Sequence, residues 1–208
     1  MNDEKNLAWP IYLLLLVIIS FQILFGIGGT ALLDPDEPVY AETAKEMIRF
    51  GDYLSPRIYN DFWYDKPPVF YWLVVASLKV FGGFSELAAR LPAALMAIGS
   101  ILMTALASAR LFGARVGFWS GIVMGTSIIL MYMGKASVTD STLLFFLTAA
   151  LFSFLHRQYW LMYFVCGLAV MTKGPIGVVF PAGIVFFYLL AMRQFEQLFR
   201  MHILRGLL

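Results

Sequence analysis

The chain has 208 residues, of which 61% are hydrophobic and only 13% are charged, and its mean hydropathy is +0.79. A soluble domain carries about 25% charged residues, so this composition excludes an ordinary soluble globular protein and predicts an integral membrane protein. The net charge of +2 gives no indication of nucleic acid binding, and the single cysteine excludes an intrachain disulfide.

The first apolar run extends over residues 7–33 without a charged side chain. A membrane span needs about 20 residues, so this run predicts a transmembrane helix with length to spare for tilt. A cleaved signal peptide is the alternative, since residues 28–31 are small or short. The apolar region is too long for a signal peptide and the tail before it is not basic. We therefore expect a retained helix.

A dense polar loop follows, because residues 34–66 hold eight of the thirteen acidic side chains. Pro38 suits the first turn of a helix, Val39, Thr43, Met47 and Phe50 repeat at helical spacing, and Gly51 can end it. This pattern predicts a short amphipathic helix, too charged to cross a membrane, that lies in the interface.

A second short helix is predicted after this loop. Residues 67–78 are apolar but cover only roughly 18 Å as a helix, well short of a ~30 Å hydrocarbon core. We expect an interfacial helix that ends at residues 81–83. A seventh membrane span is the alternative.

The remaining apolar runs complete an all-α, multi-span membrane bundle in one domain, residues 1–208. Six spans are expected, at about residues 9–29, 88–110, 116–134, 141–156, 159–172 and 174–192, with an extracytoplasmic loop at 34–87. The turn at 110–115, the turn at Arg157 and the tail with Arg193, Arg200 and Arg205 are basic, which predicts a cytoplasmic position for all three. Six spans then place the acidic loop, residues 135–140 and Lys173 together on the outer face.

Each polar group on that face has a functional and a structural interpretation. Asp36 and Glu37 are a general base or metal-binding pair, or helix caps. Asp65 and Lys66 form a phosphate site, or a snorkelling pair at the interface.

The same choice applies further along the chain. Asp140 lies near Lys135 in a short turn, and it is either a cavity ligand or a helix cap. Lys173 stands at a helix break, where it neutralises a phosphate or marks the interface. The aromatic residues 62–64 and 71–72 favour membrane anchoring over sugar stacking.

The order of these motifs resembles a known family. The matching segments are Asp36-Glu37, Tyr40-Ala41-Glu42, Gly51-Asp52-Tyr53, Lys66-Pro67-Pro68, Tyr71-Trp72, Phe81-Gly82, Ala89-Arg90-Leu91-Pro92, Asp140 and Met171-Thr172-Lys173-Gly174. The pattern is similar to the aminoarabinose transferase and protein mannosyltransferase group of GT-C glycosyltransferases, and most similar to the bacterial ArnT-like branch. It covers nearly the whole chain in order.

The resemblance implies an inverting glycosyltransferase in the bacterial inner membrane that is active on the extracytoplasmic face. It would take a sugar from a polyprenyl-phosphate donor and pass it to a lipid, glycan or protein acceptor. Asp36 matches the residue that activates the acceptor and Lys66 the residue that contacts the carrier phosphate. Asp65 stands where the aminoarabinose transferases have glutamate, and its side chain is shorter, so it reaches less far toward a metal. A divalent metal is the one cofactor that the resemblance leaves open.

The candidate residues are therefore of three kinds. Asp36, Glu37 and Asp140 are the catalytic candidates, Lys66, Lys173 and Lys135 the donor-phosphate candidates, and Asp65 the metal-ligand candidate. Family members are much longer, so the chain is expected to be the N-terminal part of such an enzyme. A non-catalytic membrane protein, either a carrier-lipid transporter or an assembly subunit, is the alternative. Charges gathered at one face favour chemistry on a lipid headgroup over transport.

Overall fold

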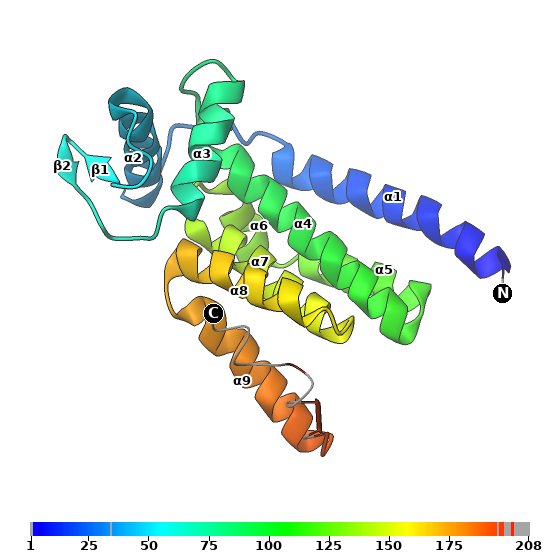
Figure 1. The fold of residues 1–208 in the computed structure, drawn as a ribbon. Helices are drawn as coiled ribbons and strands as arrows, with labels where there is room; N and C mark the ends of the chain where they lie inside the picture. The colour runs from blue at the N-terminus through cyan, green and yellow to red at the C-terminus, as the bar shows by residue number, and fades with distance from the viewer. Residues whose placement is uncertain (1, 34, 195, 198–200, 202–208) are drawn as a thin grey trace.

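The computed structural model describes residues 2–33, 35–194, 196, 197 and 201. Asp34, which begins the predicted loop, and Arg200 and Arg205 of the predicted basic tail lie outside this set. Figure 1 shows an elongated helical bundle with a small hairpin at one end. The elements are α1 (Asn2–Leu24), α2 (Asp36–Phe50), β1 (Arg57–Ile58), β2 (Asp61–Phe62), α3 (Val69–Val80), α4 (Glu86–Phe112), α5 (Ala114–Gly125), α6 (Ile128–Lys135), α7 (Thr139–Leu155), α8 (Tyr159–Lys173) and α9 (Ile176–Ala191).

Helix α4 is the central element, because it packs against α1, α3, α5, α6 and α7. Its start is set by Ser85, whose hydroxyl accepts a hydrogen bond from the Ala88 N–H. The helix is rich in alanine, and its alanines at 88, 89, 93, 94, 97 and 105 are buried. Small side chains let the neighbouring helices approach α4 closely from several directions.

Three glycines bring α5 close to α1 and α4. Gly117, Gly121 and Gly125 repeat every fourth residue, so they share one face of the helix, and all three are buried. A Cβ atom at Gly117 would lie 2.5 Å from the backbone oxygen of Ala105 on α4, and one at Gly121 would lie 2.6 Å from Leu15 on α1. The glycine stripe therefore allows backbone contact between helices that longer side chains would separate.

The predicted span at 116–134 is not one continuous helix. The structure divides it into α5 and α6, which meet at 65° across Thr126 and Ser127. The Thr126 hydroxyl donates a hydrogen bond to the Ile122 carbonyl at 2.8 Å. The side-chain amide of Gln22 donates to the Gly125 carbonyl at 3.3 Å. A polar group on α1 thus satisfies a carbonyl at the break, and the bend carries α6 across the bundle toward the start of α4.

Both short helices that the sequence predicts are present, as α2 and α3. They pack on each other, and α3 also packs on α4. Gly51 ends α2 in the left-handed conformation, at φ 66°, as the prediction required. The buried face of α2 contains Tyr40, Ala44 and Met47, whereas Phe50 is exposed. These residues share a hydrophobic cluster with α3, and the position of either helix relative to a membrane remains a prediction.

A short hairpin, which the sequence did not indicate, connects α2 to α3. Strands β1 and β2 pair antiparallel, with Arg57 opposite Phe62. Tyr59 and Asn60 form the two-residue turn, both at positive φ, as a type I′ turn requires. The Asn60 N–H donates to both oxygens of the buried Glu46 carboxylate, at 3.0 and 3.1 Å, so the turn is held against α2.

Length and composition identify few spanning helices in the described part of the chain. Only α4 is long and apolar enough on its own, and α5 with α6 pass the same test when the bent pair is taken together. The segment Tyr12–Leu24 and helices α3, α7, α8 and α9 are apolar but shorter. The six spans stay a prediction.

The bundle nevertheless has two different ends. Arg110 at the end of α4 contacts His156 after α7, so two of the predicted cytoplasmic turns lie together. The polar loop, the α6–α7 connection and the α8–α9 turn gather at the opposite end (Figure 1).

Candidate active site

Asp65 and Lys66 lie in the segment just before α3. The Lys66 ammonium donates to the Asp65 carboxylate at 2.9 Å, and the two side chains remain 27% and 47% exposed. That hydrogen bond raises the pKa of Lys66, which keeps the ammonium charged. Pro67 and Pro68 follow directly and lead into the helix, so the backbone behind the pair is stiff.

A second ion pair joins α8 to α7. Lys173, the last residue of α8, donates to the carboxylate of Asp140 in the first turn of α7 at 2.7 Å. Gly174 then adopts φ 83°, which favours glycine, and Pro175 precedes α9. The turn holds Lys173 at the end of the bundle that carries the polar loop.

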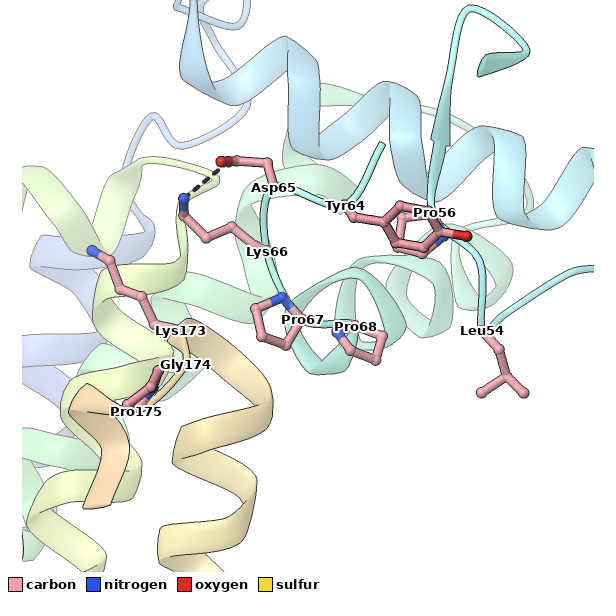
Figure 2. Close-up of a pocket in the computed structure, with 10 residues that line it drawn as sticks. All are labelled: Leu54, Pro56, Tyr64, Asp65, Lys66, Pro67, Pro68, Lys173, Gly174 and Pro175. Atoms are coloured by element: carbon pink, nitrogen blue, oxygen red, sulfur yellow. Dashed lines mark hydrogen bonds and ion pairs between the residues drawn. The ribbon is translucent and has the colours of Figure 1, made fainter. Parts of the chain in front are cut away.

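The two lysines share one pocket. It has a volume of about 590 Å³ and is lined by Leu54, Pro56, Tyr64, Asp65, Lys66, Pro67, Pro68, Lys173, Gly174 and Pro175. Figure 2 shows Lys66 and Lys173 on the same side of this pocket, with Tyr64 and Leu54 away from Lys173. Two cations on separate segments thus face one space large enough for a phosphate-bearing ligand.

Glu37 is buried at the start of α2 and both of its carboxylate oxygens are hydrogen bonded. Its side chain is 3% exposed, and Arg90 donates to both of its oxygens, at 2.8 and 2.7 Å. The backbone N–H groups of Leu33 and Ser137 donate to it at 2.8 and 2.6 Å. Burial opposes the charged form, but these hydrogen bonds prevail and lower the pKa of Glu37. Its lone pairs are occupied, so it is poorly placed to accept a proton from a substrate.

Arg90 connects this carboxylate to the end of the first helix. Its guanidinium also donates to the carbonyl oxygens of Ile27, Thr30 and Ala31 at 2.8 to 2.9 Å. The Ser137 hydroxyl donates to the Ala89 carbonyl at 2.8 Å. The Glu37–Arg90 pair therefore fixes the chain after α1, the start of α2 and the α6–α7 connection in one buried node.

The other two sequence candidates lie at different distances from the pocket. Asp36 is the exposed first residue of α2, one position before the buried node. It is not a pocket-lining residue, although the node holds its backbone at this end of the bundle. Lys135 donates to the Phe25 carbonyl at 3.1 Å and does not line the pocket either. The structure thus brings Lys66, Asp65, Lys173 and Asp140 together and leaves Lys135 against the end of α1.

Two tyrosines line the interface between α2 and α3 near the ion pairs. Tyr40 and Tyr71 are buried, with ring centroids 5.9 Å apart. Burial raises the pKa of both phenols, so both stay protonated.

A metal role for Asp65 would require further ligands close to its carboxylate. Among the residues that the structure describes, no three histidine, cysteine, aspartate or glutamate side chains are grouped to hold a metal ion. The Asp65 carboxylate is engaged by Lys66. These residues by themselves do not supply a metal site around Asp65.

Sequence reasoning gave no role to Arg90 or Leu54, and it read Tyr64 as a membrane anchor rather than as part of a pocket. Arg90 stands in the first turns of a long apolar helix, and such a charge requires a buried partner, which was a usable signal. No sequence signal places Leu54, Pro56 and Tyr64 in one pocket, because their arrangement depends on the unpredicted hairpin.

The family is established by comparison with known proteins. The model of the dolichyl-phosphate-mannose-protein mannosyltransferase family matches residues 65–207, more than half of the chain. The chain belongs to this family. The prediction of a GT-C glycosyltransferase of this group is confirmed.

Several relatives align over most of the chain. An uncharacterized protein of Aquifex aeolicus is 32% identical over 195 residues, which are 90% of this chain and 39% of that protein. The undecaprenyl phosphate-alpha-4-amino-4-deoxy-L-arabinose arabinosyl transferase of Pectobacterium carotovorum is 28% identical over 94% of this chain and 37% of its own length.

Solved structures give the same result for the fold. The crystal structure of ArnT from Cupriavidus metallidurans in the apo state has a TM-score of 0.86 and 26% identity, over 94% of this chain and 39% of that one. The structure of that protein bound to undecaprenyl phosphate has the same score and identity. The chain therefore spans about two fifths of the length of these relatives.

Proposed function

We propose that this chain carries the donor-phosphate site of a glycosyltransferase that moves a sugar from a polyprenyl-phosphate carrier to a lipid, glycan or protein acceptor. The observation that carries the proposal is the pocket shared by Lys66 and Lys173, each paired with a carboxylate. A phosphodiester between a sugar and a lipid needs cations at the depth of the headgroups, and lysine is a suitable point charge for phosphate.

The chemistry follows from the two kinds of group at this end of the bundle. The acceptor hydroxyl attacks the anomeric carbon and gives its proton to a carboxylate, while the bond from that carbon to the phosphate oxygen breaks. The polyprenyl phosphate leaves with the bonding electron pair, and the configuration is inverted. Lys66 and Lys173 would stabilise the charge that grows on the phosphate.

We assign the base to Asp36 and a positioning role to Glu37. Asp36 is exposed and immediately precedes Glu37, whose carboxylate is held by Arg90 and two backbone N–H groups. A base needs a free lone pair within reach of the acceptor, and only the first of the two residues has that freedom. Asp140 would hold Lys173 in place, and Lys135 is left out because the Phe25 carbonyl engages it.

The proposal includes a location. The polar end of the bundle faces the extracytoplasmic side of the bacterial inner membrane, and the turns around Arg110 and Arg157 face the cytoplasm. Helices α2 and α3 would lie in the outer interface, where their exposed apolar side chains meet lipid.

Binding of undecaprenyl phosphate to the protein in lipid nanodiscs tests the phosphate site. Lys66→Ala and Lys173→Ala should each weaken binding about tenfold, the effect of losing one charge-assisted hydrogen bond. Lys45→Ala is the matched control, since this lysine pairs with Glu42 on α2 outside the pocket. Equal affinity for all three variants and the wild type would reject the site.

Asp36→Asn separates the enzyme from its alternative, a non-catalytic carrier-lipid transporter or assembly subunit. The enzyme predicts that membranes containing this variant no longer release polyprenyl phosphate from a polyprenyl-phosphate sugar, while binding of the free carrier is retained. Release at the wild-type rate would remove Asp36 from the mechanism.

A further inference from the structure

A second groove lies between α4 and α5, beginning near the turn that joins them. It has a volume of about 840 Å³. Its lining residues include Thr104 of α4 and Arg115, Val116, Trp119, Ser120 and Val123 of α5. The α4–α5 turn lies away from α2 and the hairpin (Figure 1), and none of these residues lines the pocket of Lys66 and Lys173. The groove is therefore separate from the candidate active site.

Arg115 gives this groove a positive charge. It lies in the first turn of α5 and is exposed, and no carboxylate pairs with it among the side chains that the structure describes. The nearby Arg110 contacts His156 after α7 instead. Asp140 is the one acidic residue of the sequence between positions 91 and 195, and it is paired at the polar end of the bundle. The charge of Arg115 therefore suits an anionic ligand in the groove.

Two hydroxyl groups in the groove lack a bond that helical hydroxyls commonly make. Thr148, Ser153 and Thr172 each donate to the carbonyl four residues earlier, at 2.8 Å. The Thr104 and Ser120 hydroxyls, which line the groove, make no such bond within the described part of the chain. A hydroxyl in apolar surroundings needs a partner, so these two can donate to acceptor oxygens of a ligand.

Polarity changes in a definite order along the groove. Arg115, Trp119 and Val123 follow one another every fourth residue, so they lie along one side of α5, about 6 Å apart. Trp119 and Val123 are 58% and 69% exposed. A phospholipid has a phosphate, then glycerol esters, then acyl chains, and tryptophan is typical of the level between headgroup and chain. The groove therefore matches a phospholipid along its length.

We propose that the α4–α5 groove binds one anionic phospholipid from the leaflet in which the α4–α5 turn lies. The phosphate pairs with the Arg115 guanidinium, which can donate two parallel hydrogen bonds to it. The ester carbonyls accept from Thr104 and Ser120, and an acyl chain lies against Trp119 and Val123. In the orientation proposed above this is the cytoplasmic leaflet, which carries anionic lipid. The lipid contacts both helices and so stabilises their packing.

Native mass spectrometry of the delipidated protein tests this site. The two probes are dioleoylphosphatidylglycerol and dioleoylphosphatidylcholine, which have the same acyl chains and differ in net charge. The wild type should bind phosphatidylglycerol about tenfold more tightly, the effect of one charge-assisted hydrogen bond. Arg115→Gln should remove this preference. Ser120→Phe should weaken both lipids about tenfold, because the ring occupies the groove.

Two control variants match these substitutions. Arg157→Gln removes an exposed arginine from the turn after α7, at the same end of the bundle but outside the groove, and should keep the tenfold preference. Leu106→Phe adds a ring to α4 at a position that is 43% exposed and does not line the groove, so it should leave both affinities unchanged. Thermal midpoints without lipid check that every variant folds.

Four outcomes would overturn the inference. Equal affinity of the wild type for both lipids would reject the role of Arg115. Loss of the preference in Arg157→Gln as well as in Arg115→Gln would mean that the whole basic surface attracts lipid. Unchanged affinities in Ser120→Phe would place the lipid elsewhere. Displacement of phosphatidylglycerol by an equal concentration of glycerol 3-phosphate would make the ligand a soluble phosphate. None of these results involves Lys66 or Lys173, so the proposed function is tested separately.

Discussion

Replacing Glu37 by glutamine tests whether the buried node holds this end of the bundle together. The side chains of Arg90 and Glu37 are 4% and 3% exposed, so water cannot compensate for a lost hydrogen bond. Each Glu37 oxygen accepts one hydrogen bond from Arg90 and one from a backbone N–H, that of Leu33 or that of Ser137. Glutamine keeps one of these oxygens and replaces the other with an NH₂ group, which cannot accept a hydrogen bond from the donors that face it. Arg90 is left as a buried charge without a counter-ion.

The expected loss is large. Breaking a buried ion pair by removing one partner costs about 3–5 kcal/mol of unfolding free energy. For a domain of about this size each kcal/mol moves the thermal midpoint by roughly 2–4 °C. The midpoint of the Glu37→Gln protein in detergent should therefore fall by about 10 °C.

Glu42→Gln on the same helix is the control for this substitution. Glu42 pairs with Lys45 at 2.9 Å, but both side chains are more than a third exposed. Such surface pairs contribute less than about 1 kcal/mol, so its midpoint should change by no more than about 3 °C. If Glu37→Gln is as mild as Glu42→Gln, the node does not stabilise this end and the positioning role is refuted.

The geometry makes three other predictions. Gly177→Ala should lower the unfolding free energy by about 1–3 kcal/mol in thermal unfolding, because the new Cβ would clash with backbone atoms of Ala169 and Val170 on α8. Gly183→Ala on the same helix is the control: its Cβ would have no atom within 4 Å, so this substitution should not lower the unfolding free energy. The lowered pKa of Glu37 means that its contribution to stability is complete above its unfolded value of 4.5 and is lost as the pH falls below it, so the midpoint difference between wild type and Glu37→Gln should shrink below about pH 4.5. A constant difference down to about pH 3 would contradict that shift. In intact cells, cysteine at Asp140 should react with an impermeant thiol reagent, in a Cys166→Ser background, and cysteine at Arg157 should not; labelling of Asp140 only after permeabilisation would reject the six-span topology.

The helices that the sequence predicted well are those with local signals. For α2, the proline in the first turn, the helical spacing and Gly51 gave both the element and its end, and the structure agrees. The short length of the apolar run at 67–78 likewise gave α3, which ends at Val80. Local steric and hydrogen-bonding rules decide these features, so a single segment contains the information.

The break between α5 and α6 could not be predicted in the same way. Residues 116–134 have no charge and no proline, so hydropathy indicates one continuous span. At the bend, the Gly125 carbonyl accepts a hydrogen bond from Gln22, which lies more than 100 positions earlier. A contact between α1 and α5 is invisible to any window along the chain, because only the packed structure places the two side by side.

The same reasoning explains which residues of the candidate site could be predicted from the sequence. The charged residues are conspicuous in an apolar chain, and the parity of the predicted spans is enough to place Lys66, Asp140 and Lys173 at one end. Neither argument separates a group that is free to react from one that is already bound. Glu37 and Asp36 are neighbours with the same chemistry, and only the position of Arg90 makes one a buried support and leaves the other exposed. The difference between the two acidic residues thus depends on the ion pair between Arg90 of α4 and Glu37 of α2, and it should disappear when Arg90 is replaced.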